Sequence, residues 1–291
     1  MQKIYFRLLL VVALGAVTLS ASAATPRFTK LYVFGDSYCD VGNVSIATGG
    51  ARPGPLYYQG RFSNGPLWVD HIAGYLGLKL APALAGGTDW AFAGAWVTSP
   101  QDGVPTVPQQ VQMYLNAAGG KADPNALYFL DGGGNDIVGT TSGDPNALGY
   151  QIAAGIADSE LMLRRAGARH FIIPNLFNVG LLPVAADHVQ FAAAASASAN
   201  QWLTKLLWFD QKLPAIQILR VDVNSLMNAV QTDQTHFGFV NVTSPCLVAT
   251  DTSASICNDP DHTFFWDIYH PTVFGHAFFA VVIENALAQG N

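Results

Sequence analysis

The chain has 291 residues, of which 50% are hydrophobic and 12% are charged, and its formal net charge is −6. An average globular chain has about 25% charged residues, and a disordered chain combines low hydrophobicity with high net charge. The composition therefore excludes a disordered chain and a coiled coil, and the lack of a basic stripe excludes a nucleic-acid-binding protein.

The amino-terminal segment has the pattern of a secretory signal peptide. Lys3 and Arg7 precede an apolar run from Leu8 to Leu19, and Ala21-Ser22-Ala23 is a small-x-small cleavage site. This run is too short to cross about 30 Å of hydrocarbon, and no later run reaches the roughly 18 apolar residues of a transmembrane helix. We expect a signal peptide over 1–23, a single domain over 24–291, no transmembrane segment after cleavage, and secretion to the periplasm or the medium.

The first predicted strand, Leu31–Phe34, leads into Gly35-Asp36-Ser37. A serine just beyond a buried strand, where a helix would begin, has its hydroxyl at the carboxyl edge of the sheet, beside outward-pointing N–H groups. This position suits a nucleophile that also helps to bind an oxyanion, although an isolated serine there can equally be an N-cap. We expect Cys39 to be a buried free thiol.

The next features are a helix and a second strand. Asn64-Gly65-Pro66 opens a predicted helix, and the strand Ala126–Leu130 leads into Gly133-Gly134-Asn135-Asp136. The amide of Asn135 is a candidate oxyanion donor, and the alternative is a glycine turn whose Asn and Asp cap the next helix. A dinucleotide fingerprint is excluded, because its third glycine would fall on Ile137.

The rest of the chain continues the alternation of helices and strands. We expect helices at Gln151–Arg165, over most of Ala185–Lys212 and at Thr272–Leu287, and strands at His170–Ile173 and Ile216–Val221. Short strands that are apolar throughout predict a parallel sheet covered on both faces, which is an α/β fold. In such sheets ligands bind beyond the carboxyl ends of the strands.

The carboxyl-terminal third has two cysteines and an Asp-x-x-His motif. Cys246 and Cys257 are eleven residues apart, and in an exported chain we expect them to form a disulfide bond. Asp267 and His270 precede the last predicted helix, so the carboxylate could fix the tautomer of the imidazole while the other ring nitrogen faces Ser37. His262 and the helical His276 are expected to have no such role.

Four short blocks, in this order along the chain, resemble those of the GDSL (SGNH) hydrolase family of esterases and lipases. They are Phe34-Gly35-Asp36-Ser37 with Asp40 and Gly42-Asn43, Asp89-Trp90-Ala91-Phe92-Ala93-Gly94-Ala95, Gly133-Gly134-Asn135-Asp136, and Trp266-Asp267-Ile268-Tyr269-His270-Pro271-Thr272. Two further segments, 59–65 and 238–243, resemble segments of secreted members. The α/β-hydrolase motif G-x-S-x-G is absent, because Cys39 replaces its second glycine.

The resemblance implies a flavodoxin-like, three-layer α/β/α fold with a central, mostly parallel sheet. It implies Ser37 as nucleophile, His270 as general base and then acid, and Asp267 as the residue that orients His270. The oxyanion donors would be the backbone N–H groups of Ser37 and Gly94 and the amide of Asn135, with no metal or organic cofactor. Three residues depart from the family pattern, which has Asn at Asp89, often Gly at Ala93, and Leu at Tyr38.

The predicted function is that of a secreted serine carboxylic-ester hydrolase acting on lipid or short-chain acyl esters. A carbohydrate acetylesterase or an acyltransferase on the same site is the alternative, and a non-catalytic exported binding protein is a further one. A metal-dependent phosphoesterase would use Asp36, Asp136, Asp267 and His270 as ligands. The expected partner is a small-molecule or lipid ester.

Overall fold

The computed structural model describes residues 28–250 and 252–289, so the predicted signal peptide over 1–23 lies outside the described residues. Its core is a four-stranded parallel sheet in the order β1-β2-β3-β4. The strands are β1 (Leu31–Phe34), β2 (Leu127–Leu130), β3 (His170–Pro174) and β4 (Gln217–Val221). Phe34 pairs with Leu130 in the register of β1 and β2. The segments that follow these two strands therefore leave the sheet side by side.

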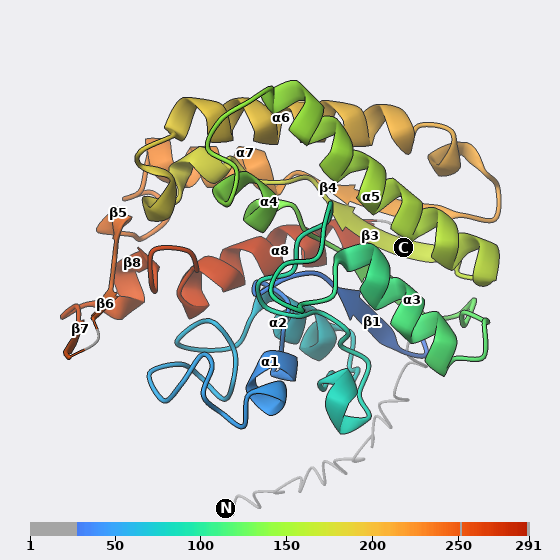
Figure 1. Cartoon of the computed structure of the whole chain (residues 1–291), viewed down its shortest axis with the longest axis horizontal. Helices are drawn as coiled ribbons and strands as arrows, with labels where there is room; N and C mark the ends of the chain where they lie inside the picture. Colours follow the sequence, from blue (N-terminus) through green and yellow to red (C-terminus); the bar gives the residue numbers. More distant parts are fainter. Residues whose placement is uncertain (1–27, 251, 290–291) are drawn as a thin grey trace, which may run out of the picture.

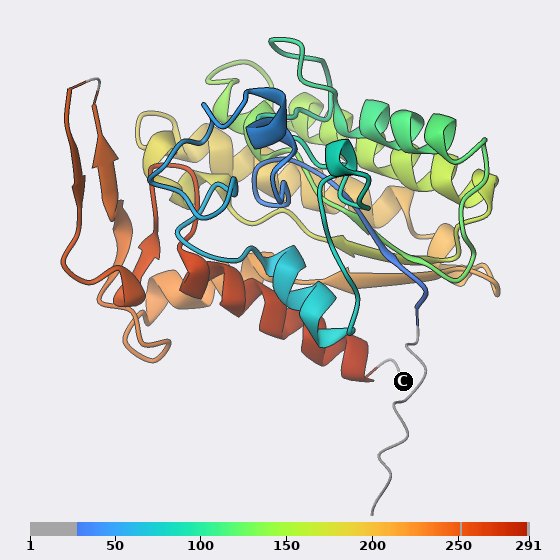
Figure 2. The same ribbon diagram turned by 90° about the horizontal axis from the view of Figure 1, so that it is seen from below.

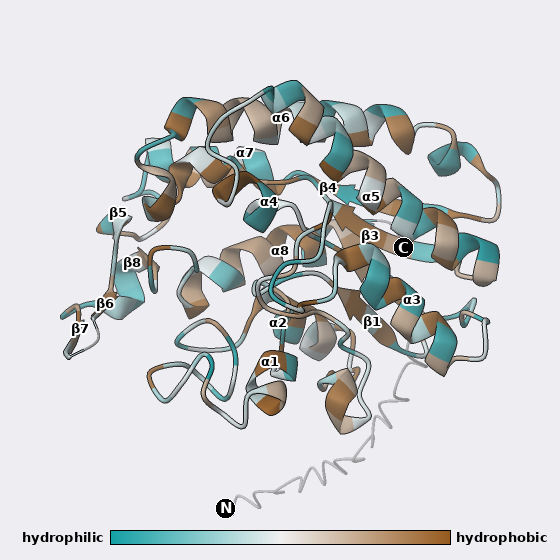
Figure 3. Cartoon of the chain, in the orientation of Figure 1, coloured by the Kyte–Doolittle hydropathy of each residue, from teal (hydrophilic) through white to brown (hydrophobic). Residues whose placement is uncertain are grey.

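Helices cover both faces of this sheet (Figures 1 and 2). One layer has α2 (Trp68–Tyr75), α7 (Val223–Thr232) and α8 (Val273–Gln289), and the other has α3 (Val107–Ala117), α5 (Pro145–Ala166) and α6 (Val189–Leu206). The short helices α1 (Asn43–Ala47) and α4 (Gly134–Val138) follow β1 and β2. Apolar residues make up β1 and most of α8, while polar and apolar residues alternate along α3 and α5 (Figure 3). The three-layer α/β/α fold is confirmed.

The boundaries of α5 and α6 differ from the predicted ones, and for α5 a capping residue explains the difference. α5 begins at Pro145, six residues before the predicted start, because the Asp144 side chain accepts a hydrogen bond from the N–H of Asn146. The predicted helix over 185–212 is shorter, since α6 ends at Leu206. The 3₁₀ helices are Ala83–Ala85, Val179–Leu181, Pro183–Ala185, Asp210–Lys212 and Pro260–His262.

A small β region lies beside the main sheet. β5 (Asn241–Pro245) pairs in parallel with β8 (Thr263–Phe265), while β6 (Leu247–Ala249) and β7 (Ala254–Ile256) form a hairpin that projects from the body at the left of Figure 2. The expected disulfide bond between Cys246 and Cys257 is present and closes the base of this hairpin. Cys39 is a buried free thiol. No helix within the described ranges is long and apolar enough to cross a membrane.

Candidate active site

Ser37 lies at the carboxyl edge of the sheet, in a single turn rather than at a helix start. The N–H groups of Cys39 and Asp40 both donate to the carbonyl oxygen of Asp36, at 3.0 Å, and α1 begins only at Asn43. α3 holds the start of this turn, because the buried Gln110 amide donates to the Gly35 carbonyl at 2.8 Å and accepts from the Gly35 N–H at 2.9 Å. A side chain from a neighbouring layer thus supports the backbone just before Ser37.

The structure brings Ser37, His270 and Asp267 into one hydrogen-bonded chain. His270 Nε2 lies 2.7 Å from Ser37 Oγ. His270 Nδ1 lies 2.8 Å from Asp267 Oδ2 and 2.9 Å from Asp267 Oδ1. All three residues are buried, with 6–8% of each exposed. Asp267 and His270 come from the loop between β8 and α8, whereas Ser37 follows β1.

Asp267 is held as a carboxylate. Burial by itself would raise its pKa, but the charge of His270 and the hydrogen bonds that the carboxylate accepts outweigh burial, so the pKa lies below its usual value. The donors, besides His270 Nδ1, are the backbone N–H groups of Tyr269 (2.7 Å) and His270 (2.8 Å) and the hydroxyl of Tyr57 (2.8 Å). The carboxylate therefore stays ionised and faces the imidazole.

The three residues predicted to supply the oxyanion donors, Ser37, Gly94 and Asn135, line one cleft. Within the described residues, the backbone N–H groups of Ser37 and Gly94 donate to no protein acceptor. Gly94 has φ +86°, a left-handed conformation that favours glycine. The Asn135 amide donates to Asp36 Oδ2 at 3.2 Å and to the Ala95 carbonyl at 3.1 Å, so an oxyanion would share the amide with these acceptors or displace one.

The cleft in front of Ser37 has a volume of about 330 Å³. Its lining includes the apolar side chains of Trp96, Val138, Leu176, Phe177 and Leu182. Arg52 is the single Lys or Arg among its described lining residues. Two acidic side chains, Asp36 and Asp131, also line the cleft. Burial and then the charge of Asp131 raise the pKa of Asp36 to about 7, and burial raises the pKa of Asp131 to about 6.

The departures from the family pattern have defined places in the structure. The Tyr38 hydroxyl donates to the Tyr269 carbonyl at 2.7 Å, and its ring stacks on Phe177 at 5.2 Å, so this side chain ties the nucleophile turn to the loop of His270. Asp89 is fully buried and accepts hydrogen bonds from the N–H groups of Val41 (2.7 Å) and Ala91 (2.9 Å). A carboxyl group thus holds the block that carries Gly94, and burial raises its pKa well above the usual value.

Asp136, His262 and His276 lie outside the contact chain of Ser37, His270 and Asp267. Asp136 accepts hydrogen bonds from the N–H groups of Val97 and Thr98, both at 2.9 Å, and so holds the loop before α3. His262 is exposed beside Asp259, and His276 is fully buried in α8, where burial lowers its pKa. Among residues 28–250 and 252–289, no three His, Cys, Asp or Glu side chains gather as metal ligands.

Two polar side chains at this site were not predicted from the sequence. They are Tyr57, which contacts Asp267, and Gln110, which contacts Gly35. Neither lies in one of the four blocks. Gln110 follows Thr106 and Gln109, which form a capping box at the start of α3, and that signal could have located its helix. No comparable signal marks Tyr57.

Comparison with known proteins decides the family. The family profile of GDSL-like lipases and acylhydrolases matches residues 31–283. The chain belongs to this family. It is an ester hydrolase, as the sequence predicted.

Curated relatives of this GDSL hydrolase come from bacteria and plants. The thermolabile hemolysin of Vibrio parahaemolyticus is 26% identical, over 93% of this chain and 66% of its own length, just under two thirds. A GDSL esterase/lipase of Arabidopsis thaliana is 26% identical, over 86% of this chain and 85% of its own. The phosphatidylcholine-sterol acyltransferase of Aeromonas hydrophila is 28% identical, over 80% and 70%.

Solved structures share the fold of this GDSL hydrolase at low sequence identity. A carbohydrate acetylesterase from Sinorhizobium meliloti superimposes with a TM-score of 0.50 and 14% identity, covering 90% of this chain and 99% of its own. A putative arylesterase from Agrobacterium tumefaciens does so with 0.51 and 12%, covering 89% and 98%. These likenesses concern the fold alone.

Proposed function

We propose that the protein is a secreted serine carboxylic-ester hydrolase that works through an acyl-enzyme. The observation that carries this proposal is the contact chain from Asp267 through His270 to Ser37, with 2.8 Å and 2.7 Å between the polar atoms. In an activated nucleophile, the hydroxyl lies within hydrogen-bonding distance of an imidazole, and a carboxylate orients that imidazole. The three residues have this arrangement.

The reaction would proceed in two halves. His270 Nε2 takes the proton of Ser37 as Oγ attacks the ester carbonyl, and it then donates that proton to the leaving alcohol. In the second half His270 takes a proton from water, whose oxygen attacks the acyl carbon, and the proton returns to Ser37 as the acid leaves. Asp267 keeps the imidazole in the required tautomer and stabilises its protonated form.

The negatively charged oxygen of each tetrahedral intermediate would accept hydrogen bonds from the oxyanion donors beside Ser37. The free N–H groups of Ser37 and Gly94 support this role, and the Asn135 amide would be the third donor. Removing one such donor from a hydrolase costs about 3–4 kcal/mol of transition-state stabilisation.

We infer that the acyl group of the substrate lies against the apolar lining residues of the cleft. Trp96, Phe177 and Leu182 are among them, and they suit the hydrocarbon of a lipid or short-chain acyl ester. The related phosphatidylcholine-sterol acyltransferase, as its name states, acts on a lipid ester. The alternatives are that the substrate is an acetylated carbohydrate, or that the acyl group is transferred to a second alcohol.

Secretion is part of the same proposal. Residues 1–23 would be the signal peptide and 24–291 a single hydrolase domain, exported to the periplasm or the medium. The Cys246–Cys257 disulfide supports an oxidising compartment.

Replacing the nucleophile tests the proposal. Ser37→Ala is expected to lower kcat for p-nitrophenyl butyrate by about 10⁶-fold and to abolish labelling by a fluorophosphonate, since both need an activated serine oxygen. Ser45→Ala, in α1, is the matched control and should keep both. Hydrolysis rates of wild-type protein on p-nitrophenyl esters of graded acyl-chain length, compared with the rate on an acetylated polysaccharide, identify the preferred acyl group. Full activity or labelling in Ser37→Ala would contradict the assignment.

A further inference from the structure

The hydroxyl of Tyr57 contacts the carboxylate of Asp267 from outside the family blocks. Tyr57 lies in the loop between α1 and α2, and its hydroxyl donates to Asp267 Oδ2 at 2.8 Å. The other carboxylate oxygen, Oδ1, accepts the backbone N–H groups of Tyr269 and His270. Tyr57 is therefore the side chain, other than His270 itself, that fixes how this carboxylate is turned.

The phenol remains a donor across the working pH range. Burial, followed by the charge and the hydrogen bond of Asp267, raises the pKa of Tyr57. Its ring packs against Phe62 at 6.0 Å and edge-on against Trp266 at 6.4 Å. These contacts limit the directions in which the hydroxyl can point.

The ring of Tyr57 also belongs to the small apolar cluster around the disulfide. Buried Cys246, Leu247 and Trp266 form this cluster, with Tyr57 and Cys257 packed against it. Tyr57 thus contacts both the disulfide region and the carboxylate that faces His270.

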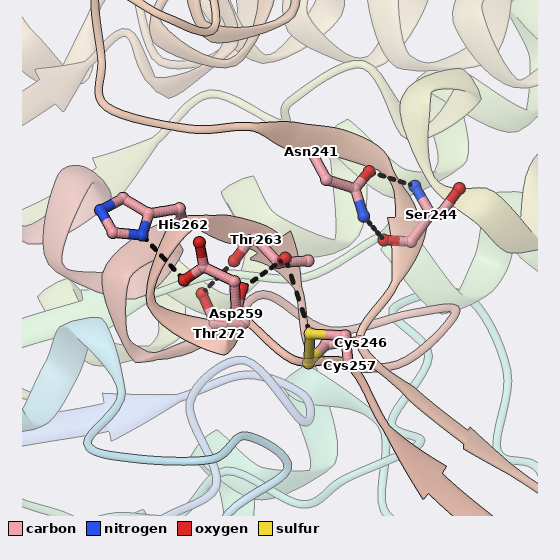
Figure 4. The surroundings of a disulfide bond; sticks show 8 residues. All are labelled: Asn241, Ser244, Cys246, Cys257, Asp259, His262, Thr263 and Thr272. Carbon is pink, nitrogen blue, oxygen red and sulfur yellow. Dashed lines mark hydrogen bonds and ion pairs between the residues drawn. A yellow bond between two sulfur atoms is a disulfide. The ribbon is translucent and has the colours of Figure 1, made fainter.

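The backbone beside the disulfide leads directly to Asp267. The N–H of Cys246 donates to the Phe265 carbonyl at 2.9 Å, and the N–H of Leu247 donates to the Trp266 carbonyl at 2.6 Å. On the other side, Cys257 Sγ lies 3.7 Å from the hydroxyl of Thr263, at the start of β8 (Figure 4). The disulfide therefore braces the strand that ends two residues before Asp267.

We propose that Tyr57 is a positioning residue for Asp267, and that the Cys246–Cys257 disulfide holds Tyr57 and the end of β8 in place for this task. This inference rests on the proposed role of Asp267 and His270. The hydroxyl sets the rotamer of the carboxylate and takes up part of its negative charge.

Removing the hydroxyl has a defined electrostatic consequence. The carboxylate then exerts more of its charge on His270 and stabilises the protonated imidazole, so the acid limb of the pH–rate profile moves to higher pH. Among the described residues, the other titratable groups near this pair are Asp36, Tyr38, Tyr269 and His276. They keep their places in a variant that changes only the Tyr57 hydroxyl.

The test compares Tyr57→Phe with Tyr58→Phe. The neighbouring Tyr58 packs its ring near Arg61, at 5.7 Å, and does not contact Asp267, so it is a matched control. For p-nitrophenyl butyrate we expect Tyr57→Phe to lower kcat about tenfold, the effect of one hydrogen bond to a charged group, with KM unchanged. The acid limb of kcat/KM should move to higher pH by about half a unit to one unit, whereas Tyr58→Phe should match the wild type.

A second measurement tests the brace. The double variant Cys246→Ser/Cys257→Ser is made in the wild type and in Tyr57→Phe, and we expect it to lower kcat severalfold in the wild type but much less in Tyr57→Phe. Equal losses in the two backgrounds would overturn the brace. The positioning role would be overturned if the acid limb of the kcat/KM profile stays in place in Tyr57→Phe. This holds even if the midpoint of thermal unfolding falls.

A proton NMR signal separates this inference from the proposed function. The low-field resonance of the His270 Nδ1–H reports the contact with Asp267 whether or not the protein turns over an ester, and it should shift in Tyr57→Phe but not in Tyr58→Phe. Wild-type protein without esterase activity would refute the proposed function alone. An unshifted resonance in Tyr57→Phe would refute the inference alone.

Discussion

At the scale of single residues, the site depends on the surroundings of one carboxylate. Asp267 is buried, yet its pKa is lowered because His270, two backbone N–H groups and Tyr57 all favour the charged form. A buried carboxylate with this many donors has little freedom to turn. The imidazole of His270 is therefore held with its Nε2 atom facing the Ser37 hydroxyl.

Replacing Asp267 by Asn should slow turnover without abolishing it. The amide keeps the shape of the side chain but favours the wrong imidazole tautomer, and we expect kcat to fall about 10⁴-fold, with a residual rate from the oxyanion donors. Steady-state kinetics on p-nitrophenyl butyrate measure the effect, and the exposed Asp261→Asn is the control. A loss of less than tenfold would show that Asp267 does not orient His270.

The sequence pointed to Ser37, Asn135, Asp267 and His270 because each lies in a short local block. Their spacing along the chain carries no information about distance in space, but each block follows a strand or precedes a helix, which limits where it can lie. Tyr57 and Gln110 could not be found in this way. Their function depends on contacts with residues far away in the chain, and no local pattern specifies such contacts.

At the scale of elements, α3 decides the geometry of the nucleophile turn. The capping box of Thr106 and Gln109 starts this helix, and one residue later Gln110 binds both backbone groups of Gly35. The turn of Ser37 is therefore supported from a helix more than 70 residues away, since the contact spans 75 positions.

Gln110→Leu tests this support. Leucine fills similar space but leaves a buried N–H and a buried carbonyl of Gly35 unpaired, at about 1–3 kcal/mol each. We expect the free energy of unfolding to drop by about 3 kcal/mol and kcat for p-nitrophenyl butyrate to fall in the fraction that remains folded. Gln112→Leu, on the exposed face of α3, is the control. Unchanged stability and activity in Gln110→Leu would show that the turn holds itself.

The elements that the sequence predicted well share one property. β1 and β2 are apolar throughout, and β3 and β4 are mostly apolar, since both faces of the sheet are covered. Apolar runs of this kind can be found from the sequence alone. α3 and α7 were not predicted, although Thr106 and Asp222 cap them. The β6–β7 hairpin was not predicted either, because its three-residue strands are mostly exposed and lack a clear periodicity.

At the scale of the whole molecule, few charges are present but several are buried. Burial raises the pKa of six carboxyl groups: Asp36, Asp40, Asp89, Asp131, Asp136 and Glu160. At these six groups the folded protein therefore binds more protons than the unfolded chain above about pH 4. The stability contributed by these groups is complete below that pH and is lost as the pH rises through their folded pKa values, about 7 for Asp36 and Glu160.

Three groups act in the opposite direction, so the prediction compares a variant with the wild type. Asp222, Asp267 and His276 have lowered pKa values, and the stability that they contribute is lost as the pH falls. Asp131→Asn removes one raised pKa and the charge that helps to raise that of Asp36. We expect the thermal unfolding midpoint of this variant to fall less between pH 5 and about pH 7.5 than that of the wild type. The exposed Asp158→Asn should follow the wild type, and equal slopes for Asp131→Asn would contradict the account.

The sequence by itself determined the fold class, the family and the polar residues at the ends of the strands, because apolar runs and short blocks are local properties. Only the tertiary structure decided which side chains hold that site: Tyr57 contacts Asp267, Gln110 contacts Gly35, and Asp89 accepts hydrogen bonds from the N–H groups of Val41 and Ala91. It also decided how the scarce charges act, since a carboxyl group changes its pKa only when folding removes water from it and sets its partners beside it.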